Sequence, residues 1–365
     1  MATTLVVTND FPPRVGGIET YLRHVCGFLD DAVVVLTRTE RDEHATRAYD
    51  ASLPFPVHRV SGPLLPTPAL GRRAAELMRA YGAEQVVFGA AAPLGLLASG
   101  LRRTGARRIL ALSHGHEVWW SRVPGARGML RRIGHDVDAL GVISTYTATP
   151  IASALAPEDR AKLVMLPPPV DLGLFTPAPN PPVAAVVAAS RFVRQKGLDK
   201  LLDAWSHVAA VVPDSRLVIV GDGPEAARLR RRAAGLARVE IRPPVSHDRM
   251  PDLLRSASVF VSPVRTRLGG LYAEGLGLVA CEAAACGIPV VVGRSGGAPE
   301  TVVDQVTGSV VDVDDATVLA TAIIGWLTNP VSAREAGRAG REHVARLVGA
   351  EHVRSRLRET LGADT

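Results

Sequence analysis

The alternation of short apolar runs with helix-like stretches, from one end of the chain to the other, most constrains its fold. Runs rich in Val, Ile and Leu recur in both halves, and each predicts a buried strand: residues 3–9, 31–38, 84–90, 107–115 and 139–145, then 182–191, 215–223, 238–245, 258–264 and 288–293. Helical periodicity separates them, for example over residues 200–211 and 225–236. Apolar strands that alternate with helices form parallel sheets covered on both faces. The two series therefore predict an α/β fold with two doubly wound domains.

Two proline-rich segments, residues 166–171 and 176–182, stand between the two series. Neither a helix interior nor a central strand accommodates so many prolines, so we expect a linker there. The length of 365 residues is too great for one ordinary core and suits two domains. We expect a first domain over residues 1–168, a linker over 169–182 and a second domain over 183–345. A last, polar helix is expected over roughly residues 333–361.

Cysteine content and the N-terminus indicate a protein of the cytosol. Cys26, Cys281 and Cys286 form neither a CxxC pair nor an even framework, so we interpret them as reduced thiols rather than disulfides or zinc ligands. No basic segment precedes the first apolar run, as a signal peptide would require. The longest apolar stretch, residues 86–101, is short for a bilayer span and contains Pro93.

Basic residues outnumber acidic ones in one part of the first half of the chain. Between Arg72 and Arg132 there are 11 arginines and only three acidic residues, within a chain of formal net charge +6. A cationic face of this kind attracts an anionic surface, either phospholipid or nucleic acid. The alternative is a solvated, arginine-rich face without a partner. The doublets that would form the face are Arg72 with Arg73, Arg102 with Arg103, Arg107 with Arg108, and Arg131 with Arg132.

Two glycine motifs follow predicted strands. Gly16 and Gly17 stand between the first strand and a helix, where backbone N–H groups can approach an anion, although any strand-to-helix turn can need glycine. Residues 221–226 fit a GxGxxA dinucleotide pattern. However, Asp222 would repel a pyrophosphate and Pro224 removes a donor N–H. We therefore do not expect a dinucleotide-binding dehydrogenase.

Paired cations and paired carboxylates lie in the second half. Arg191 and Lys196 are five residues apart in a loop that follows a predicted strand, an arrangement suited to a diphosphate. Glu274 and Glu282 are eight apart, and a glycine-rich loop leads from the first into an apolar helix that carries the second. A carboxylate on such a helix needs a partner. Vicinal sugar hydroxyls would serve, and a buried salt bridge is the alternative.

Taken together, these motifs resemble the retaining GT-B glycosyltransferases of family 4. The resemblance rests on the E-x7-E pair, SR-x4-KG, GDGP, SGGAPE (residues 295–300) and NDFPP-x2-GG, and covers nearly the whole chain. Segments such as VTNDFPPRVGGIETYL and SHGHEVWW are similar to those of actinobacterial GDP-mannose-dependent α-(1→6) phosphatidylinositol monomannoside mannosyltransferases. The resemblance implies a GT-B fold, with an acceptor-binding first domain, a donor-binding second domain and a C-terminal helix (346–365) that packs back toward the first.

The resemblance also implies roles for individual residues. Arg191 and Lys196 would bind the donor diphosphate, which Gly16 and Gly17 would cover. Glu282 would accept hydrogen bonds from the ribose, and Glu274 from the sugar. His114 would contact the sugar or a reacting oxygen; His116 is the weaker candidate, and either histidine could instead be structural. Backbone groups that would hold the base and sugar belong to Val245, Gly275, Leu276, Gly277, Leu278 and Val279.

The reaction implied is transfer of mannose from GDP-mannose to a phosphatidylinositol mannoside, with retention and without a metal or other cofactor. The enzyme would lie on the inner face of the cell membrane, which the arginine face would contact, and we expect no nucleic-acid partner. One alternative is a related glycosyltransferase with another nucleotide sugar and a soluble acceptor. Another is a basic binding module without activity.

Overall fold

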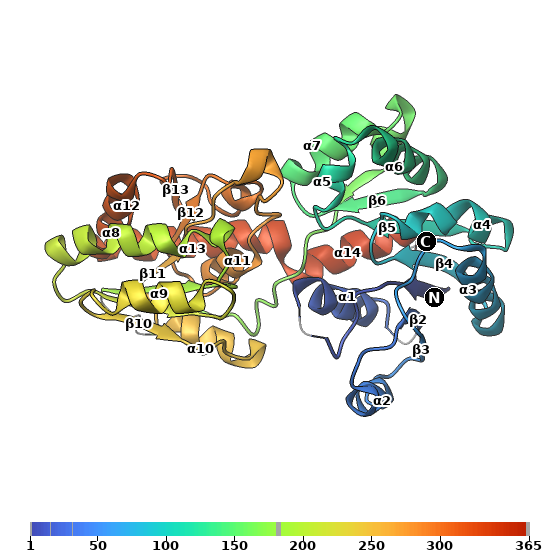
Figure 1. Ribbon diagram of the computed structural model, residues 1–365, viewed down its shortest axis with the longest axis horizontal. Helices are drawn as coiled ribbons and strands as arrows, with labels where there is room; N and C mark the ends of the chain where they lie inside the picture. The colour runs from blue at the N-terminus through green and yellow to red at the C-terminus, as the bar shows by residue number, and fades with distance from the viewer. Residues whose placement is uncertain (1, 15, 31, 180–183, 363–365) are drawn as a thin grey trace. The chain divides into compact units, whose positions relative to one another are not determined.

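The computed structural model describes residues 2–14, 16–30, 32–179 and 184–362, and it divides into two compact units, each built around one sheet (Figure 1). Unit 1 comprises residues 1–169 with 353–365, and unit 2 comprises residues 170–352. Neighbouring strands pair in parallel in both sheets, for example β1 with β4 and β8 with β11. The two doubly wound α/β domains predicted from the sequence are confirmed.

The described part of unit 1 holds a seven-stranded sheet in the order β3-β2-β1-β4-β5-β6-β7. Its strands are β1 (Thr3–Val7), β2 (Val33–Arg38), β3 (Val57–Val60), β4 (Ala83–Phe88), β5 (Arg108–Leu112), β6 (Ala139–Val142) and β7 (Leu163–Met165). Its helices are α1 (Gly17–Phe28), α2 (Glu43–Ala51), α3 (Pro68–Tyr81), α4 (Ala98–Arg103), α5 (Glu117–Trp120), α6 (Pro124–Asp136), α7 (Thr145–Ala154) and, from residue 353 onward, α14 (Ala350–Leu361).

Side chains along the central strand of unit 1 alternate between two cores, as the pleat of a strand requires. Leu5 and Val7 pack with α3, α4, α6 and α7, whereas Val6 packs with α1 and α14. Helices therefore cover both faces of the sheet, which explains why its strands are apolar throughout.

The described part of unit 2 holds a six-stranded sheet in the order β10-β9-β8-β11-β12-β13. Its strands are β8 (Ala185–Ala189), β9 (Arg216–Val220), β10 (Val239–Arg242), β11 (Val259–Ser262), β12 (Val290–Gly293) and β13 (Gly308–Val311). Its helices are α8 (Leu198–Val211), α9 (Ala226–Ala233), α10 (Met250–Arg255), α11 (Leu278–Ala285), α12 (Ala316–Thr328) and α13 (Pro330–Val348). Helices α10, α11 and α13 pack on one face, and α8, α9 and α12 on the other.

The proline-rich segment differs from the linker expected over residues 169–182. The N–H of Val170 donates to the carbonyl oxygen of Val348 at 2.7 Å, and Phe175 is fully buried in the core of unit 2. Residues 170–179 therefore belong to unit 2, while residues 180–182 lie outside the described residues, as does Val183, where the second domain was expected to begin.

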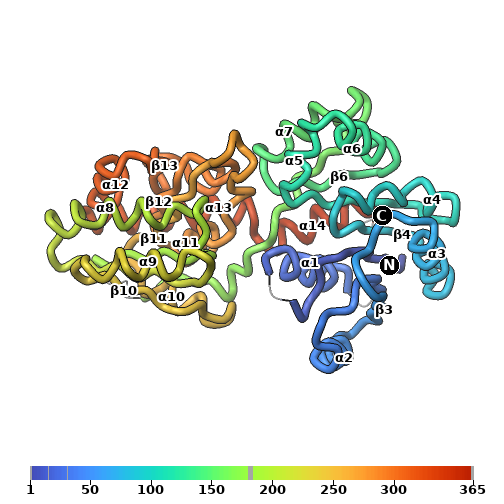
Figure 2. The backbone as a smooth tube through the Cα atoms, in the orientation of Figure 1, coloured from blue at the N-terminus to red at the C-terminus, as the bar shows by residue number. Residues whose placement is uncertain are grey.

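The last helical stretch is two helices rather than one. Val170 pairs with Gly349 in an isolated bridge, and the N–H of Ala350 donates to the carbonyl oxygen of Val170, so the chain turns between α13 and α14. Figure 2 follows the red C-terminal tube along α14. Leu357 and Leu361 of α14 are buried against α1 and the sheet of unit 1. The C-terminus is thus a structural part of unit 1.

Among the described helices, none alone is both long and apolar enough to cross a bilayer; α12 and α13 meet that criterion only as a pair bent by 100°.

Candidate active site

Lys196 and Glu274 meet at the carboxyl ends of two neighbouring strands of unit 2. Lys196 follows β8 and Glu274 follows β11, the two strands at which the strand order of this sheet reverses. Ligands of doubly wound domains bind at such a switch point. The Nζ of Lys196 donates to Oε2 of Glu274 at 2.5 Å, and both side chains are partly buried. A cation therefore lies next to a carboxylate that can accept hydrogen bonds from hydroxyl groups.

The SGG segment after β12 positions Glu274. The N–H of Gly297 donates to the backbone oxygen of Glu274 at 2.9 Å, and the N–H of Glu274 approaches Oγ of Ser295 at 3.4 Å. At Gly296, where φ is +57°, a Cβ would lie 1.9 Å from the backbone oxygen of Glu274. Only glycine permits this close approach, so the motif fixes the loop that carries the carboxylate.

Arg191 differs from the other cations near it. Its side chain is exposed and makes no hydrogen bond or ion pair with any described residue. By contrast, Arg194 is paired with Glu225 at 3.3 Å, and the nearest downstream acid, Asp199, is held by Arg265 at 2.9 Å. Arg191 is thus the free cation of this loop, beside a Lys196 that already contacts Glu274.

The GDGP segment after β9 supports the Arg191 loop instead of forming a dinucleotide turn. The N–H of Phe192 donates to the backbone oxygen of Asp222 at 2.7 Å. A Cβ at Gly221 would lie 2.0 Å from the backbone oxygen of Ser190. The glycine therefore allows two loops to pack backbone to backbone, which agrees with the rejection of a dehydrogenase site.

Glu282 is the fifth residue of a short apolar helix, and it is buried. It lies on α11 among Ala280, Cys281, Ala283 and Ala284, and only 4% of it is exposed. Burial raises the pKa of its carboxyl to about 8. Nδ1 of His247 lies 3.9 Å from Oε1 of Glu282. No described Lys or Arg pairs with this carboxyl, so it is better suited to accept hydrogen bonds from the hydroxyls of a ligand.

The segment between Glu274 and α11 offers backbone donors. Gly277 precedes α11 in a left-handed conformation (φ 99°), and no side chain caps the first turn. Gly275, Leu276, Leu278 and Val279 complete this segment, which is mostly half-buried. The first N–H groups of a helix favour anions and polar ligand atoms. Val245 lies farther along the same edge, after β10, and packs half-buried against the core.

In unit 1, His114 follows β5 and lies close to the β1–β4 switch point. Its Nε2 donates to the carbonyl oxygen of Gly89, which follows β4, and its ring stands edge-on to Tyr21 with centroids 5.5 Å apart. Burial lowers the pKa of His114, so the imidazole is neutral near pH 7. With Nε2 as the donor, Nδ1 is an acceptor and bonds no described residue. His116 is exposed.

The two N-terminal glycines differ in what surrounds them. A Cβ on Gly16 would lie 2.2 Å from Oε2 of Glu19, whereas a Cβ on Gly17 would meet no described atom within 4 Å. Glu19 is buried in the first turn of α1, where its Oε1 accepts from Arg14. Space beside Gly17 is therefore open, while the space beside Gly16 is filled by a carboxylate of the protein itself.

Sequence reasoning missed two groups at these sites. Glu19 could have been noticed as the acid three residues after Gly16, at the start of a helix. His247, near both Glu282 and the ring of Phe175, carries no signal of its own because it follows a strand in an ordinary turn. Among the described residues, no group of three or more His, Cys, Asp or Glu side chains is arranged to hold a metal ion.

The arginine doublets of unit 1 are exposed but partly neutralised. Arg73 pairs with Glu76, Arg102 with Asp138 and Arg107 with Glu84, at 3.3, 2.7 and 3.4 Å. The side chains of their three doublet neighbours have no hydrogen-bonding or ion-pair partner among the described residues: Arg72, Arg103 and Arg108. The excess of positive charge at this surface is smaller than the count over residues 72–132 indicates, because Asp138 lies outside those residues and still pairs with Arg102.

Comparisons with known proteins agree with this geometry. Residues 15–174 match the family model Glycosyltransferase Family 4, and residues 177–343 match the model Glycosyl transferases group 1. The chain is 42% identical over 357 residues to a GDP-mannose-dependent monoacylated alpha-(1-6)-phosphatidylinositol monomannoside mannosyltransferase from Corynebacterium glutamicum, with 93% of each covered. It is 43% identical to a GDP-mannose-dependent alpha-(1-6)-phosphatidylinositol monomannoside mannosyltransferase from Mycolicibacterium smegmatis, with 92% of each covered. The solved sucrose-phosphate synthase from Thermosynechococcus elongatus has the same fold, with a TM-score of 0.76 at 24% identity over 100% of both chains.

Proposed function

Because this chain belongs to glycosyltransferase family 4 and has its GT-B fold, we propose that it transfers mannose from GDP-mannose to a phosphatidylinositol mannoside. The linkage formed is α-1,6, and the configuration at the anomeric carbon is retained. The two curated relatives are named for this donor and acceptor class, and they match the chain over nine-tenths of its length.

The observation that carries the proposal is the contact between Lys196 and Glu274 at the switch point of unit 2. A nucleotide sugar joins a diphosphate directly to a hydroxyl-rich ring, so its binding site needs a cation and a hydroxyl acceptor a few ångströms apart. Lys196 supplies the first and Glu274 the second. Arg191, unpaired in the same loop, supplies another cation for the diphosphate.

The chemistry that we propose uses few protein groups. The acceptor hydroxyl attacks the anomeric carbon from the face that the diphosphate leaves, and a donor phosphate oxygen takes the acceptor proton. Lys196 and Arg191 stabilise the negative charge that develops on the departing diphosphate. Glu282 accepts hydrogen bonds from the ribose and Glu274 from the sugar. Positioning and charge stabilisation account for the rate, so the reaction requires no metal ion.

A donor titration tests the nucleotide and sugar. We expect GDP-mannose to bind the intact protein more tightly than UDP-glucose in isothermal titration, with the affinity unchanged by EDTA. Arg191→Ala should weaken binding, whereas Arg194→Ala, which removes a cation already paired with Glu225, should not. Equal or tighter binding of UDP-glucose would exclude transfer from GDP-mannose as the activity. It would not affect the assignment of the chain to its glycosyltransferase family.

We further propose that the arginine surface of unit 1 docks the enzyme on anionic lipid at the inner face of the cell membrane. Three of its arginines are exposed and unpaired within the described structure, and each is worth about 1 kcal/mol near an anionic surface. Replacing them by Gln should reduce cosedimentation with phosphatidylglycerol vesicles at low salt. The replaced residues are Arg72, Arg103 and Arg108.

The control for charge alone is a variant with three exposed arginines of unit 2 replaced by Gln: Arg230, Arg231 and Arg346. It should keep vesicle binding if the unit 1 surface is responsible. Binding that is absent at low salt, or that falls equally in both variants, would leave the arginines as a solvated face.

A further inference from the structure

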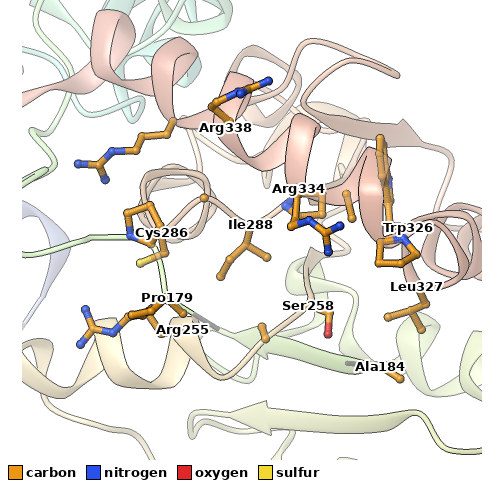
Figure 3. Close-up of a pocket in the computed structure, with 18 residues that line it drawn as sticks. Pro179, Ala184, Arg255, Ser258, Cys286, Ile288, Trp326, Leu327, Arg334 and Arg338 are labelled. Carbon is orange, nitrogen blue, oxygen red and sulfur yellow. The ribbon is translucent and has the colours of Figure 1, made fainter. Parts of the chain in front are cut away.

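A cavity of about 310 Å³ lies in unit 2, at the opposite edge of the sheet from Lys196 and Glu274 (Figure 3). It is bounded by residues that precede three strands: Ala184 before β8, Ser258 before β11 and Pro289 before β12. Donor ligands of doubly wound domains bind at the carboxyl ends of strands. This cavity is therefore separate from the donor site.

The described wall of the cavity is mostly apolar, and its charged side chains are four arginines, with no acidic residue among them. Figure 3 shows Ile288, Trp326 and Leu327 around it, together with Cys286 at its edge. Burial raises the pKa of the Cys286 thiol to about 12, so the sulfur is neutral. The volume falls at the lower end of the range of roughly 300–1,000 Å³ typical of small-molecule sites. An apolar body of modest size would fit.

Two of the arginines that line the cavity are held by the protein. Arg341 donates to the carbonyl oxygens of Leu172, Phe175 and Ala285, and so fastens the segment before β8 to the core. Arg255 is paired with Asp252 at 2.6 Å. These two guanidinium groups are structural and are not available to a ligand's charge.

Arg334 and Arg338 are different. They stand one turn apart on α13, both exposed, and neither forms a hydrogen bond or ion pair with a described residue. Figure 3 shows the two side chains extending in different directions, Arg334 toward the cavity and Arg338 away from it, so Arg334 is the guanidinium that a ligand in the cavity can reach. Guanidinium groups are the preferred partners of carboxylates and phosphates.

We propose that this cavity binds an amphiphilic anion, with its apolar chain against Ile288 and Trp326 and its carboxylate or phosphate head on Arg334. No described acidic residue lines the cavity, so a neutral ligand would leave Arg334 without a partner there. Burial of the apolar chain away from water favours binding. The ionic head adds selectivity against neutral molecules of the same length.

Tryptophan fluorescence of the full chain, with dodecanoate, dodecyl phosphate and dodecanol as probes below their aggregation concentrations, tests the proposal. At least one of the two anions should bind saturably and change the emission, and the stronger anion identifies the head group. Trp326→Phe should abolish the signal while calorimetry still detects binding. Saturating GDP-mannose should leave the binding unchanged.

Arginine variants separate the site from general attraction of anions. Arg334→Gln should weaken anion binding about tenfold or more. Arg346→Gln removes one exposed charge from the same helix outside the cavity and should have little effect. Absence of saturable binding, equal binding of dodecanol, an equal loss with Arg346→Gln, or competition by GDP-mannose would each overturn the proposal. Retained GDP-mannose binding shows that each variant is folded.

Discussion

Glu282 connects stability and function at the scale of a single residue. Its carboxyl is buried among alanines, and its pKa is raised to about 8 from an ordinary value near 4.5. Between these values the folded protein holds a proton that the unfolded chain releases, so the free energy of unfolding falls as the pH rises through this window. A ligand hydroxyl that donates a hydrogen bond to the carboxylate would favour the ionised form and offset part of this loss of stability.

Glu282→Gln tests this account. The variant should match the parent in stability at pH 5 and exceed it by on the order of 2–5 kcal/mol at pH 8.5, because an amide carries no ionisation penalty. Its affinity for GDP-mannose should be lower at pH 8 and independent of pH, while that of the parent increases from pH 6 to 8. Denaturant unfolding and calorimetric titration supply the two readouts. Glu335→Gln, on an exposed part of α13, is the control. If the stability of Glu282→Gln changed with pH as much as that of the parent, the proposed role of the buried carboxyl would be contradicted.

Lys196 and Arg191 test the electrostatic part of the proposed mechanism. Replacing either by Ala should lower kcat on the order of 10²-fold, as expected when charge stabilisation of a leaving group is lost. Arg194→Ala, in the same loop, should change kcat by less than about threefold because Glu225 already holds that side chain. Steady-state rates with GDP-mannose, with and without EDTA, decide the matter. Restoration of an EDTA-inhibited enzyme by Mg²⁺ would refute the metal-independent mechanism.

The positions of these residues could be predicted better than their contacts. Strand-to-helix spacing indicated that Lys196 and Glu274 follow parallel strands, and both lie at the switch point. Their direct pairing was not predicted, because it depends on which strands are neighbours. The sequence also did not show that the Glu19 carboxylate occupies the space beside Gly16. A glycine pair looks the same in sequence whether a ligand or a side chain of the protein occupies that space.

At the scale of elements, the strands inside the two described sheets were predicted, as was the edge strand β10, whereas the other three edge strands were missed. β3, β7 and β13 each lie at the edge of a sheet, and none appeared among the expected runs. β7 has only three residues, and every residue of β3 is half-buried. An edge strand has one neighbour instead of two, so its sequence need not be continuously apolar. Periodicity therefore gives little signal there.

The C-terminal helix offers a test at the same scale. Leu357 on α14 is 1% exposed in the core of unit 1, although residues 170–352 of unit 2 separate it from the rest of that unit in sequence. Leu357→Ala should destabilise the protein by about 2–5 kcal/mol, the usual range for a buried leucine. Ser355→Ala, exposed on the same helix, should be nearly neutral in chemical denaturation. Equal stability of the two variants would show that α14 does not contribute to the core.

At the scale of the whole molecule, the alternation of strands and helices was sufficient to predict two doubly wound domains. The boundary was harder to predict because proline content signals a break in helices and strands, not a break in packing. Phe175, inside the proline-rich segment, is fully buried in unit 2. Composition and spacing also could not select mannose over another sugar, since a carboxylate accepts hydrogen bonds from any suitably placed hydroxyl.

The most direct test of the central claim is an NMR measurement of the product formed by the purified chain from GDP-mannose and a phosphatidylinositol mannoside in the presence of EDTA. The account predicts release of GDP and a new α-1,6-linked mannose, with the anomeric configuration of the donor retained. A β-linked product, or no transfer from GDP-mannose while a UDP-sugar is turned over, would contradict it.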